Sequence, residues 1–539
     1  MPITDHPKES RTLGVTLRNK ARTLKDKVFI YYKDETVTYR QLEATTNRIA
    51  NTLINKFGVK KNDKIAVMLP NCPDYVFMQF GIPKTGAVQV PINTELTLDL
   101  LAYTINNCDA EVLIMDASFS LPVAVIADRL KNIKTILVRT NGSEKTTFNF
   151  GSSIEGLPYE VLLEGAEAEP PDVSVNWYDP VAIFYTSGTT GVSKGVVLPH
   201  NHHFDFPRTI AEWVRLGPSD IFYICLPFYH GLAQYMSVLP ALVSDGGIAI
   251  AERFSASQFW SDVRKYKATA VFSVYTMTPI LLKQPQKSDD ADNPLRVYCT
   301  IGIAPSLVDT FEQRFGVNSL DMFGSTEQGA IAFTPYDRKK YAAVGPINTR
   351  DYEVKIVDEF DEELPPNTVG EYVSRAKKPF LRMMEYYKMP EETVKAFRNL
   401  WLHSGDLARI DEDGWIYFEG RAKDSIRKGG ENISAFELEA VAGSYEHVEE
   451  CAVVPVSSDL GEDEIKIYLV PIQKSSLDIR SFMAFCEEKM PKFMVPRYFE
   501  VIDSLPKTGT GKVEKAELKR RKLTGKTWDR VRNDFITQA

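Results

Sequence analysis

The sequence predicts an α/β protein with a large N-terminal domain, in which parallel-rich sheets are flanked by helices, and a small α+β C-terminal domain. Short apolar runs such as 64–71, 110–116 and 134–139 alternate with longer segments of helical periodicity. That alternation is typical of βαβ units and of parallel sheets covered on both faces. The chain has 539 residues, beyond the length at which a single core stops growing, so two or more domains are expected.

The elements can be placed in chain order. Apolar residues at helical spacing predict a helix within 37–59, where Gly58 and Val59 follow the pattern. Apolar runs of strand length then recur down the chain as far as residue 275. The runs that predict strands are 64–71, 110–116, 134–139, 221–230, 247–254 and 268–275.

The pattern changes after about residue 350. Segment 352–376 alternates apolar and polar residues around "DEFDEELPPNTVG", which predicts antiparallel hairpins and a β-barrel-like subdomain. A smaller α+β unit is expected after "GWIYFEGRAKDSIRKGG". The boundary is placed in "GRAKDS", a short polar segment between two apolar strands, which gives predicted domains at 1–422 and 423–539.

Composition excludes several classes of protein. Apolar residues make up 44% of the chain, charged residues 25%, and the net charge is −8, so a nucleic-acid partner held by basic side chains is not expected. The six cysteines are far apart and form no C-x-x-C pair, which argues against a disulfide framework and a zinc site. The N-terminus has no apolar signal region and no apolar run has the length of a membrane span, so we expect a cytoplasmic protein.

The stretch "YTSGTTGVSKGV" at 185–196 combines glycines, hydroxyl side chains and one lysine directly after an apolar run. Glycines let the backbone approach a ligand and direct its N–H groups inward, and the hydroxyls and the ammonium add further donors. We interpret this stretch as a phosphate-binding loop; the alternative is a surface turn. It is not a Walker A loop, because only two residues separate Gly191 from Lys194. The candidate phosphate contacts are Thr186, Ser187, Gly188, Thr189, Thr190, Gly191 and Lys194.

This loop resembles the signature of the adenylate-forming superfamily, which includes acyl-CoA synthetases, adenylation domains of peptide synthetases and firefly luciferase. Further motifs occur in the family's order: "LPFYHGLAQ", "DMFGSTEQG", "LHSGDLARIDEDGWIYFEGRAKD" and "PKTGTGK". The C-terminal third, with "RKGGENIS" and "FMAFCEEKMPKFMVPRYFEV", is most similar to crotonobetaine/carnitine–CoA ligases. The resemblance implies an AMP-forming ligase that joins a small-molecule carboxylic acid to CoA through an acyl-adenylate, using ATP and Mg²⁺.

The resemblance also assigns roles to residues around the nucleotide. In "DMFGSTEQ", it implies that Thr326 contacts phosphate and that Glu327 holds Mg²⁺; the alternative for Glu327 is a solvated loop residue. Asp406 is implied to bind the ribose diol together with Arg421; the alternative for Asp406 is a helix cap. Further implied ATP contacts are Gly302, Ala304, Pro305, Met322, Phe323 and Gly324.

The C-terminal motifs imply a mobile domain. Lys512 of "PKTGTGK" is expected to bridge the substrate carboxylate and the α-phosphate; the alternative is an inert exposed lysine. Lys423 occupies the hinge position about which relatives are thought to pivot. Gly429, Gly430 and Glu431 are expected on the CoA side, which favours CoA over a carrier protein as the acceptor.

The acyl pocket is expected to be apolar and aromatic. The resemblance places Phe228, Tyr229 and Ile301 in its wall, and His230 at a substrate-side contact; the alternative for His230 is a core histidine. The chain departs from the family at Ile303, where "IGIAP" replaces the commoner "GGAP" or "GGEP". Such a pocket could hold a short or medium acyl chain or an aromatic acid.

Other interpretations remain. The cluster His200, His202 and His203 matches no zinc spacing, and we do not interpret it as a metal site. An adenylating enzyme that serves a carrier protein, or a nucleotide-binding scaffold without chemistry, would share much of the pattern. A scaffold should have lost Glu327, Asp406 or Lys512, and all three are present. We expect a monomer or a homodimer.

Overall fold

The computed structural model describes residues 7–96, 98–140, 148–186, 193–274, 277–421, 425–428, 431–457, 463–472, 477–490, 494–507 and 512–536. Within it the chain forms two compact units. Unit 1 takes in the chain up to Glu353 and returns at Arg375–Leu402, whereas unit 2 takes in Val354–Ser374 and the chain from His403 onward. The predicted hinge Lys423 lies outside the described residues, so the domains 1–422 and 423–539 remain a prediction.

The first sheet of unit 1 has eight strands in the order β19-β9-β8-β4-β3-β5-β6-β7 and is parallel except at the β8-β9-β19 edge. Along β3, Ile65 and Val67 face one apolar core while Ala66 and Met68 face another. Both faces are therefore covered, as the sequence predicts for parallel strands. Its strands are β3 (Lys64–Met68), β4 (Val88–Pro91), β5 (Val112–Asp116), β6 (Thr135–Arg139), β7 (Glu155–Pro158), β8 (Pro180–Thr186), β9 (Lys194–Pro199) and β19 (Glu385–Tyr386).

The second sheet of unit 1 also has eight strands, in the order β15-β14-β13-β12-β10-β11-β1-β2. Its six inner strands are parallel, and only the edge strands β15 and β2 run antiparallel to their neighbours. The strands are β1 (Val28–Tyr32), β2 (Glu35–Thr38), β10 (Ile221–Ile224), β11 (Gly247–Ile250), β12 (Ala270–Val274), β13 (Val297–Ile301), β14 (Asn318–Ser325) and β15 (Gly329–Phe333).

Two helices of unit 1, α3 (Pro73–Lys84) and α6 (His202–Trp213), are buried on nearly all sides, with ten of twelve residues buried in each. Their side chains belong to the one large apolar core that also includes residues of both sheets. A helix that is covered all round must satisfy its polar groups internally. In α3, the buried Lys84 ammonium does so by donating to Glu43, Thr46 and Asn47 at 2.6–2.8 Å.

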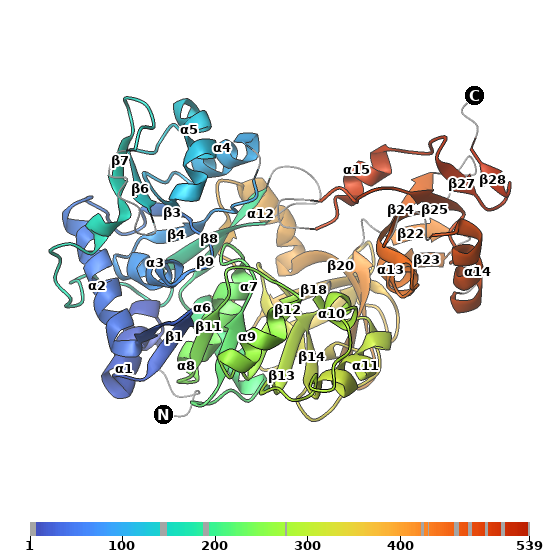
Figure 1. Ribbon diagram of the computed structural model, residues 1–539, viewed down its shortest axis with the longest axis horizontal. Helices are drawn as coiled ribbons and strands as arrows, with labels where there is room; N and C mark the ends of the chain where they lie inside the picture. Colours follow the sequence, from blue (N-terminus) through green and yellow to red (C-terminus); the bar gives the residue numbers. More distant parts are fainter. Residues whose placement is uncertain are drawn as a thin grey trace. The chain divides into compact units, whose positions relative to one another are not determined.

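The remaining helices of unit 1 cover the sheets (Figure 1). The predicted helix within 37–59 is α2 (Tyr39–Asn55), which starts with a capping box between Thr38 and Gln41. No helix in the described part of the chain is both long and apolar enough to cross a bilayer. The others are α1 (Leu13–Leu24), α4 (Leu98–Asn107), α5 (Ser120–Ile126), α7 (Gly231–Ala233), α8 (Leu239–Val243), α9 (Phe259–Lys265), α10 (Met277–Leu282), α11 (Pro305–Phe315) and α12 (Pro390–Ala396).

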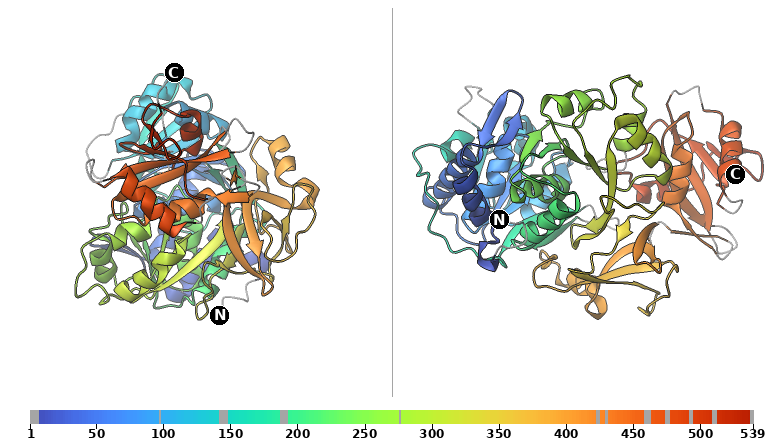
Figure 2. Two further views of the ribbon diagram at one scale, coloured as in Figure 1. Left: turned by 90° about the vertical axis from the view of Figure 1, so that its right-hand side faces the viewer. Right: turned by 90° about the horizontal axis from the view of Figure 1, so that it is seen from below.

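Unit 2 ends in a sheet of order β24-β25-β26-β27-β28 with helices on both faces (Figure 2). In β24, Val453 joins α13 and α14 in one core, whereas Ala452 and Val454 join Leu518 of α15 in another. The elements are β22 (Ser425–Lys428), β23 (Glu431–Ser434), α13 (Ala435–Gly443), β24 (Val448–Ser457), β25 (Asp463–Pro471), α14 (Ile479–Lys489), β26 (Tyr498–Val501), α15 (Lys515–Arg520), β27 (Thr527–Asp529) and β28 (Asp534–Phe535).

A further sheet, separate from those described above, lies where the sequence predicts a β-barrel-like subdomain. It contains neighbouring strands in the order β21-β20-β18-β17, and the described residues form an open sheet here rather than a closed barrel. The segment 352–376, where hairpins are predicted, forms β17 and β18, which are hydrogen-bonded neighbours in this sheet, and β20 pairs with β21 in antiparallel orientation. The strands are β17 (Tyr352–Val357), β18 (Gly370–Ala376), β20 (Leu402–Ile410) and β21 (Trp415–Arg421), and the two-residue strand β16 (Gly345–Pro346) precedes them.

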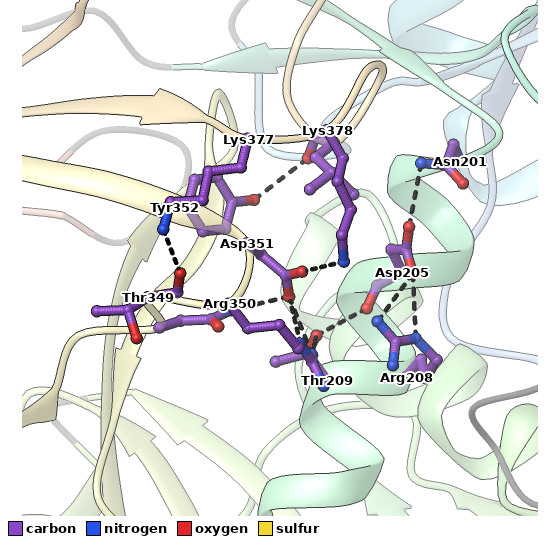
Figure 3. A network of polar contacts seen from close by, with 12 residues as sticks. Asn201, Asp205, Arg208, Thr209, Thr349, Arg350, Asp351, Tyr352, Lys377 and Lys378 are labelled. Carbon is purple, nitrogen blue, oxygen red and sulfur yellow. Dashed lines mark hydrogen bonds and ion pairs between the residues drawn. The ribbon is translucent and has the colours of Figure 1, made fainter.

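A network of charged side chains fastens the loop before β17 to α6 (Figure 3). The buried Asp205 carboxylate accepts hydrogen bonds from Asn201 and from the Arg208 Nε at 3.0 Å. Asp351, also buried, accepts bonds from Arg350 and pairs with Lys378 at 2.6 Å. Buried charges tolerate such sites only when they are paired and hydrogen-bonded, so the network fixes one relative placement of the two segments.

We predict that Asp205→Asn destabilises unit 1 by about 3 kcal/mol, because it removes the more deeply buried of the two carboxylates that neutralise the Arg208 guanidinium. Chemical denaturation measures the change. The matched control is Asp34→Asn, which removes an exposed partner of Lys265 and should leave the denaturation midpoint unchanged. Equal midpoints for the two variants would contradict a stabilising role of the Asp205 network.

Candidate active site

The predicted phosphate loop connects β8 to β9. Thr186 ends β8 and faces Lys194, the first residue of β9, across an antiparallel pair; the Thr186 hydroxyl donates to the Lys194 carbonyl at 3.4 Å. The loop between them falls outside the described residues. It contains the predicted contacts Ser187, Gly188, Thr189, Thr190 and Gly191.

Lys194 supplies the positive charge at the start of β9. Its ammonium forms an ion pair with Glu392 of α12 and lies 4.9 Å from the ring centre of Tyr386 on β19. The Lys194 side chain is 24% exposed and that of Glu392 is 40% exposed, so solvent screens the pair. The ammonium is therefore held by a carboxylate that an incoming anion could replace.

The turn between β14 and β15 carries Thr326 and Glu327. Gly324, near the end of β14, has no room for a side chain, because a Cβ there would lie 2.1 Å from the Gly329 carbonyl oxygen. Gly329 has φ +89°, in the region that favours glycine. Two glycines thus permit the tight turn that holds Thr326 and Glu327 beyond the end of the strand.

Glu327 is held by its side chain and by its backbone. The Tyr386 hydroxyl donates to the Glu327 Oε1 at 3.1 Å, and the Glu327 carbonyl accepts a bond from the Met383 N–H at 2.8 Å. The next carbonyl, of Gln328, accepts a bond from the buried Tyr352 hydroxyl at 2.6 Å. Tyr352 follows Asp351 of the network in Figure 3, so the turn is anchored to that network as well.

Thr326, next to Glu327 in the same turn, has a buried partner, Tyr235. The Tyr235 hydroxyl forms a hydrogen bond with the Thr326 side chain, and burial raises the pKa of Tyr235, so that the phenol stays protonated. Tyr235 lies in a short π-helix (Gln234–Val238) that follows His230 and α7. Gly231 makes room for the ring, since a Cβ there would lie 2.1 Å from the Tyr235 hydroxyl oxygen.

The segment between β13 and α11 contains the predicted nucleotide contacts Gly302, Ala304 and Pro305. Gly302 has φ +76°, and its N–H donates to the Asp321 Oδ1 at 2.8 Å. The Met322 N–H donates to the same oxygen at 2.8 Å. Asp321 therefore ties the β13–α11 turn to β14, and the loss of hydration around its carboxyl raises the pKa of Asp321 to about 7.

The predicted acyl-pocket residues lie in two places in unit 1. Phe228 is buried and stacks on Tyr75 at 5.0 Å between ring centres, and its carbonyl accepts a hydrogen bond from the Gln234 side-chain Nε2 at 2.6 Å. Tyr229 and His230 are partly exposed neighbours whose ring centres are 4.7 Å apart. Ile301, partly exposed, ends β13 just before the Gly302 turn. Phe228 is thus a core residue, whereas its two neighbours reach the surface.

The histidine cluster is buried among aromatic rings. Burial lowers the pKa of His200 and of His202 to about 3, and the pKa of His203 falls well below its usual range, so all three are neutral at neutral pH. His200 accepts a bond from the Leu13 N–H at 3.3 Å, and His202 packs against the rings of Phe206 and Tyr235. These contacts place the cluster in the core around α6.

The remaining predicted site residues belong to unit 2. Asp406 is buried on β20, directly opposite Arg421 of β21, and its N–H donates a hydrogen bond to the Ser404 hydroxyl oxygen at 3.0 Å. Lys512 is exposed, and Glu431 starts β23, paired with Lys428. Lys423, Gly429 and Gly430 lie outside the described residues. Asp406 is therefore a strand residue, not a helix cap.

Sequence reasoning missed the residues that hold the charged groups in place. Tyr386, Glu392 and Asp321 were not predicted as site residues. Tyr386 and Glu392 lie in "EYYKMPEET", where no spacing distinguishes them from surface residues. Asp321 stands next to the predicted contact Met322 in a strand whose neighbours are apolar, and that isolated carboxylate was the available signal.

Comparison with known proteins identifies the family of the chain. Residues 17–387 match the AMP-binding enzyme family, and residues 437–512 match the AMP-binding enzyme C-terminal domain. The chain is 32% identical over 491 residues to the crotonobetaine/carnitine–CoA ligase of Proteus mirabilis, covering 89% of this chain and 92% of that protein. It is 31% identical to the enzyme of the same name from Salmonella paratyphi A, over 89% and 93% of the two chains.

Solved structures share the fold. The anthranilate CoA ligase AuaEII in complex with anthranoyl-AMP superposes with a TM-score of 0.84 at 24% identity, covering 97% of this chain and 99% of the other. ATP-bound MatB from Rhodopseudomonas palustris gives a TM-score of 0.83 at 24% identity, over 95% and 98% of the two chains.

We predict that Asp321→Asn changes how stability depends on pH. The pKa of Asp321 is about 7 in the folded chain and near its ordinary value of 3.8 when unfolded, so the folded state binds more protons between these values. The stability contributed by protonated Asp321 is therefore complete below about pH 4 and is lost as pH rises to about 7. Asn does not titrate. Between pH 4 and pH 7, wild type should therefore lose about 1 to 3 kcal/mol of stability that the variant keeps. The melting temperature of the variant should accordingly rise relative to that of wild type as the pH increases. A difference in melting temperature between variant and wild type that stays the same at every pH would contradict the prediction.

We also predict that Glu392→Gln strengthens binding of pyrophosphate by about two- to fivefold. The variant frees the Lys194 ammonium and removes a negative charge from beside the loop. Isothermal titration calorimetry with magnesium pyrophosphate measures the affinity. Glu391→Gln removes an equal charge from the neighbouring exposed position and serves as the control. If both variants bind pyrophosphate as wild type does, Glu392 is not the competing anion.

Proposed function

The chain belongs to the AMP-binding enzyme family, and on that premise we propose that it ligates a carboxylic acid to coenzyme A at the expense of ATP, releasing AMP and pyrophosphate. A carboxylate oxygen attacks the α-phosphorus, the bond to pyrophosphate breaks, and an acyl-adenylate forms. The sulfur of CoA then attacks the acyl carbon, and AMP leaves. The observation that carries this proposal is the convergence of Lys194 and Glu327, from two different sheets, on the Tyr386 side chain.

In unit 1 the charged groups suit the phosphates of ATP. The Lys194 ammonium and the Thr186 hydroxyl stand at the two ends of the glycine-rich loop and would bind the phosphates that leave as pyrophosphate. Thr326, fixed by Tyr235, would donate to the α-phosphate. Donors that are already in place when charge develops lower the barrier most effectively. The turn of Gly302, Ala304 and Pro305, with Met322, Phe323 and Gly324, would enclose the adenine.

Glu327 fits a magnesium ion. Mg²⁺ in phosphoryl-transfer sites usually takes one or two carboxylates from the protein and the rest of its ligands from phosphate and water. Glu327 offers one such carboxylate, oriented by the Tyr386 hydroxyl, with Thr326 beside it. When bound, the ion would neutralise charge between phosphate groups.

The chain from His403 onward would supply the ribose contacts and, beyond the proposed hinge, the residues that change between the two half-reactions. Asp406 and Arg421, opposite each other on β20 and β21, would bind the ribose hydroxyls. Lys512 would neutralise the charge between the substrate carboxylate and the α-phosphate during adenylation. A pivot at Lys423 would then bring Gly429, Gly430 and Glu431 towards CoA, which requires adaptable backbone dihedrals rather than particular side chains.

The acid would enter beside Tyr229, His230 and Ile301. These residues are aromatic or apolar and partly exposed, and the buried Phe228 supports them. Relatives about one third identical are named for crotonobetaine and carnitine, so carboxylates with a trimethylammonium group belong among the candidate acids, and aromatic side chains can bind such a group. Short aliphatic and aromatic acids are the other candidates.

A panel of carboxylic acids tests the proposal. Acid-dependent release of pyrophosphate from ATP without CoA, followed by CoA-dependent release of AMP and formation of a thioester, is the expected result. Pyrophosphate release without any thioester would instead support transfer to a carrier protein. Absence of both products with every acid would overturn the proposed function.

We predict that Lys512→Ala slows adenylation by about a hundredfold or more, because it removes the one ammonium proposed to neutralise the forming bond. Thioester formation from preformed acyl-adenylate should fall by less than about fivefold, because that step does not use this charge. Lys526→Ala removes an exposed lysine elsewhere in unit 2 and serves as the control. Equal losses in both half-reactions would contradict the role of Lys512.

A further inference from the structure

We propose that Tyr386 is a positioning residue that keeps the Glu327 carboxylate and the Lys194 ammonium separate and correctly oriented. The inference rests on the proposed function, because it assumes that Glu327 serves a metal ion and Lys194 serves phosphate. It assigns a role to a residue of β19 that would act on the reaction only through these two groups.

The hydroxyl of Tyr386 orients Glu327. It donates to the Glu327 Oε1 at 3.1 Å, so one carboxylate oxygen is engaged while the group keeps its full negative charge. A phenol hydroxyl is an uncharged hydrogen-bond donor. A neutral donor fixes the carboxylate without neutralising it, which a metal ligand requires.

The ring of the same residue contacts Lys194. The ammonium lies 4.9 Å from the ring centre, within the range of cation–π attraction. This contact orients the ammonium without pairing it with a buried carboxylate. The other contact of the ammonium is its ion pair with Glu392, which is accessible to solvent. One side chain thus touches the acidic group by its edge and the basic group by its face.

The position of Tyr386 is well fixed. Its side chain and backbone are 9% exposed in total, and the residue pairs with Val196 of β9, two residues after Lys194. Its N–H donates to the Thr393 Oγ1 at 2.9 Å. Three residues earlier, the Met383 N–H donates to the Glu327 carbonyl, so the same segment holds the backbone of the β14–β15 turn. Tyr386 is therefore anchored both to the strand of Lys194 and to the turn of Glu327.

Separation matters because the two groups carry opposite charges. A carboxylate and an ammonium in one partly dehydrated site attract each other strongly, and a direct pair would occupy the groups that metal and phosphate need. The Tyr386 side chain contacts both groups: its hydroxyl donates a hydrogen bond to the carboxylate, and its ring attracts the ammonium. Removal of the hydroxyl should release Glu327, and removal of the ring should also release Lys194.

The test uses the full chain with Tyr386→Phe, which loses the hydroxyl and keeps the ring, and Tyr386→Leu, which loses both. Tyr387→Phe is the matched control, because it removes a hydroxyl bond of similar length, 2.9 Å, from the neighbouring tyrosine to Asp109. Calorimetry measures ATP binding once with Mg²⁺ and once with EDTA. The difference reports the contribution of the metal independently of turnover.

Wild type and Tyr387→Phe should bind ATP more tightly with Mg²⁺ than with EDTA. Tyr386→Phe should lose about tenfold in affinity with Mg²⁺ and little with EDTA, and Tyr386→Leu should lose affinity in both. Excess Mg²⁺ should restore acid-dependent pyrophosphate release to Tyr386→Phe, which it could not do for a general loss of folding. In a double-mutant cycle, Glu327→Gln should abolish the effect of Tyr386→Phe.

Two results would overturn the inference. One is a Tyr386→Phe variant that keeps the whole gain from Mg²⁺. The other is a variant that loses affinity equally with Mg²⁺ and with EDTA. In both cases wild type binds ATP, and the proposed function stands. Failure of wild type itself to bind ATP would remove the proposed function, and this inference with it.

Discussion

The core shared by the two eight-stranded sheets is the constraint on which the rest of unit 1 depends. The first sheet provides the β8–β9 hairpin with Thr186 and Lys194, and the second provides β13, β14 and β15 with Asp321 and Glu327. Neither sheet holds the candidate site by itself. Residues of both sheets and of the buried helices α3 and α6 form one apolar core, and that core sets the distance between the two halves.

Segment 383–387 then joins the two halves directly. Strand β19 of this segment extends the first sheet beside β9. The Met383 N–H and the Tyr386 hydroxyl donate hydrogen bonds to Glu327, in the turn that extends from the second sheet. The charged network of Figure 3 holds the loop before β17 against α6. Tyr352, which follows that loop, donates a hydrogen bond to the Gln328 carbonyl and so connects the β14–β15 turn to the network. Apolar burial thus sets the approximate placement, and hydrogen bonds to a few carbonyls and carboxylates set the orientation.

The sequence predicted the parts of this arrangement that have a local signal. The βαβ alternation predicted parallel sheets, the helix within 37–59 is α2, and the run 134–139 contains β6. The β19–β9 pairing was not predicted, because a two-residue strand has no periodicity and its partner lies far away in the chain. Glu392 looks like any acid of an exposed helix, and only the fold reveals that Lys194 is its partner. The raised pKa of Asp321 likewise depends on neighbours that the sequence does not identify.

The Lys194–Glu392 pair balances the charge of the ammonium beside the proposed phosphate loop. A bare ammonium beside a donor-rich loop would raise the free energy of the empty enzyme, and Glu392 removes that cost with a flexible, partly exposed carboxylate. Because both side chains are accessible to water, the pair is weak and its dissociation requires little energy. Under the proposed function, a phosphate group that takes the place of Glu392 would gain charge-assisted hydrogen bonds from the Lys194 ammonium. Under the proposed function, the affinity of Lys194 for a phosphate group would be the difference between two interactions of the same ammonium, one of them with Glu392.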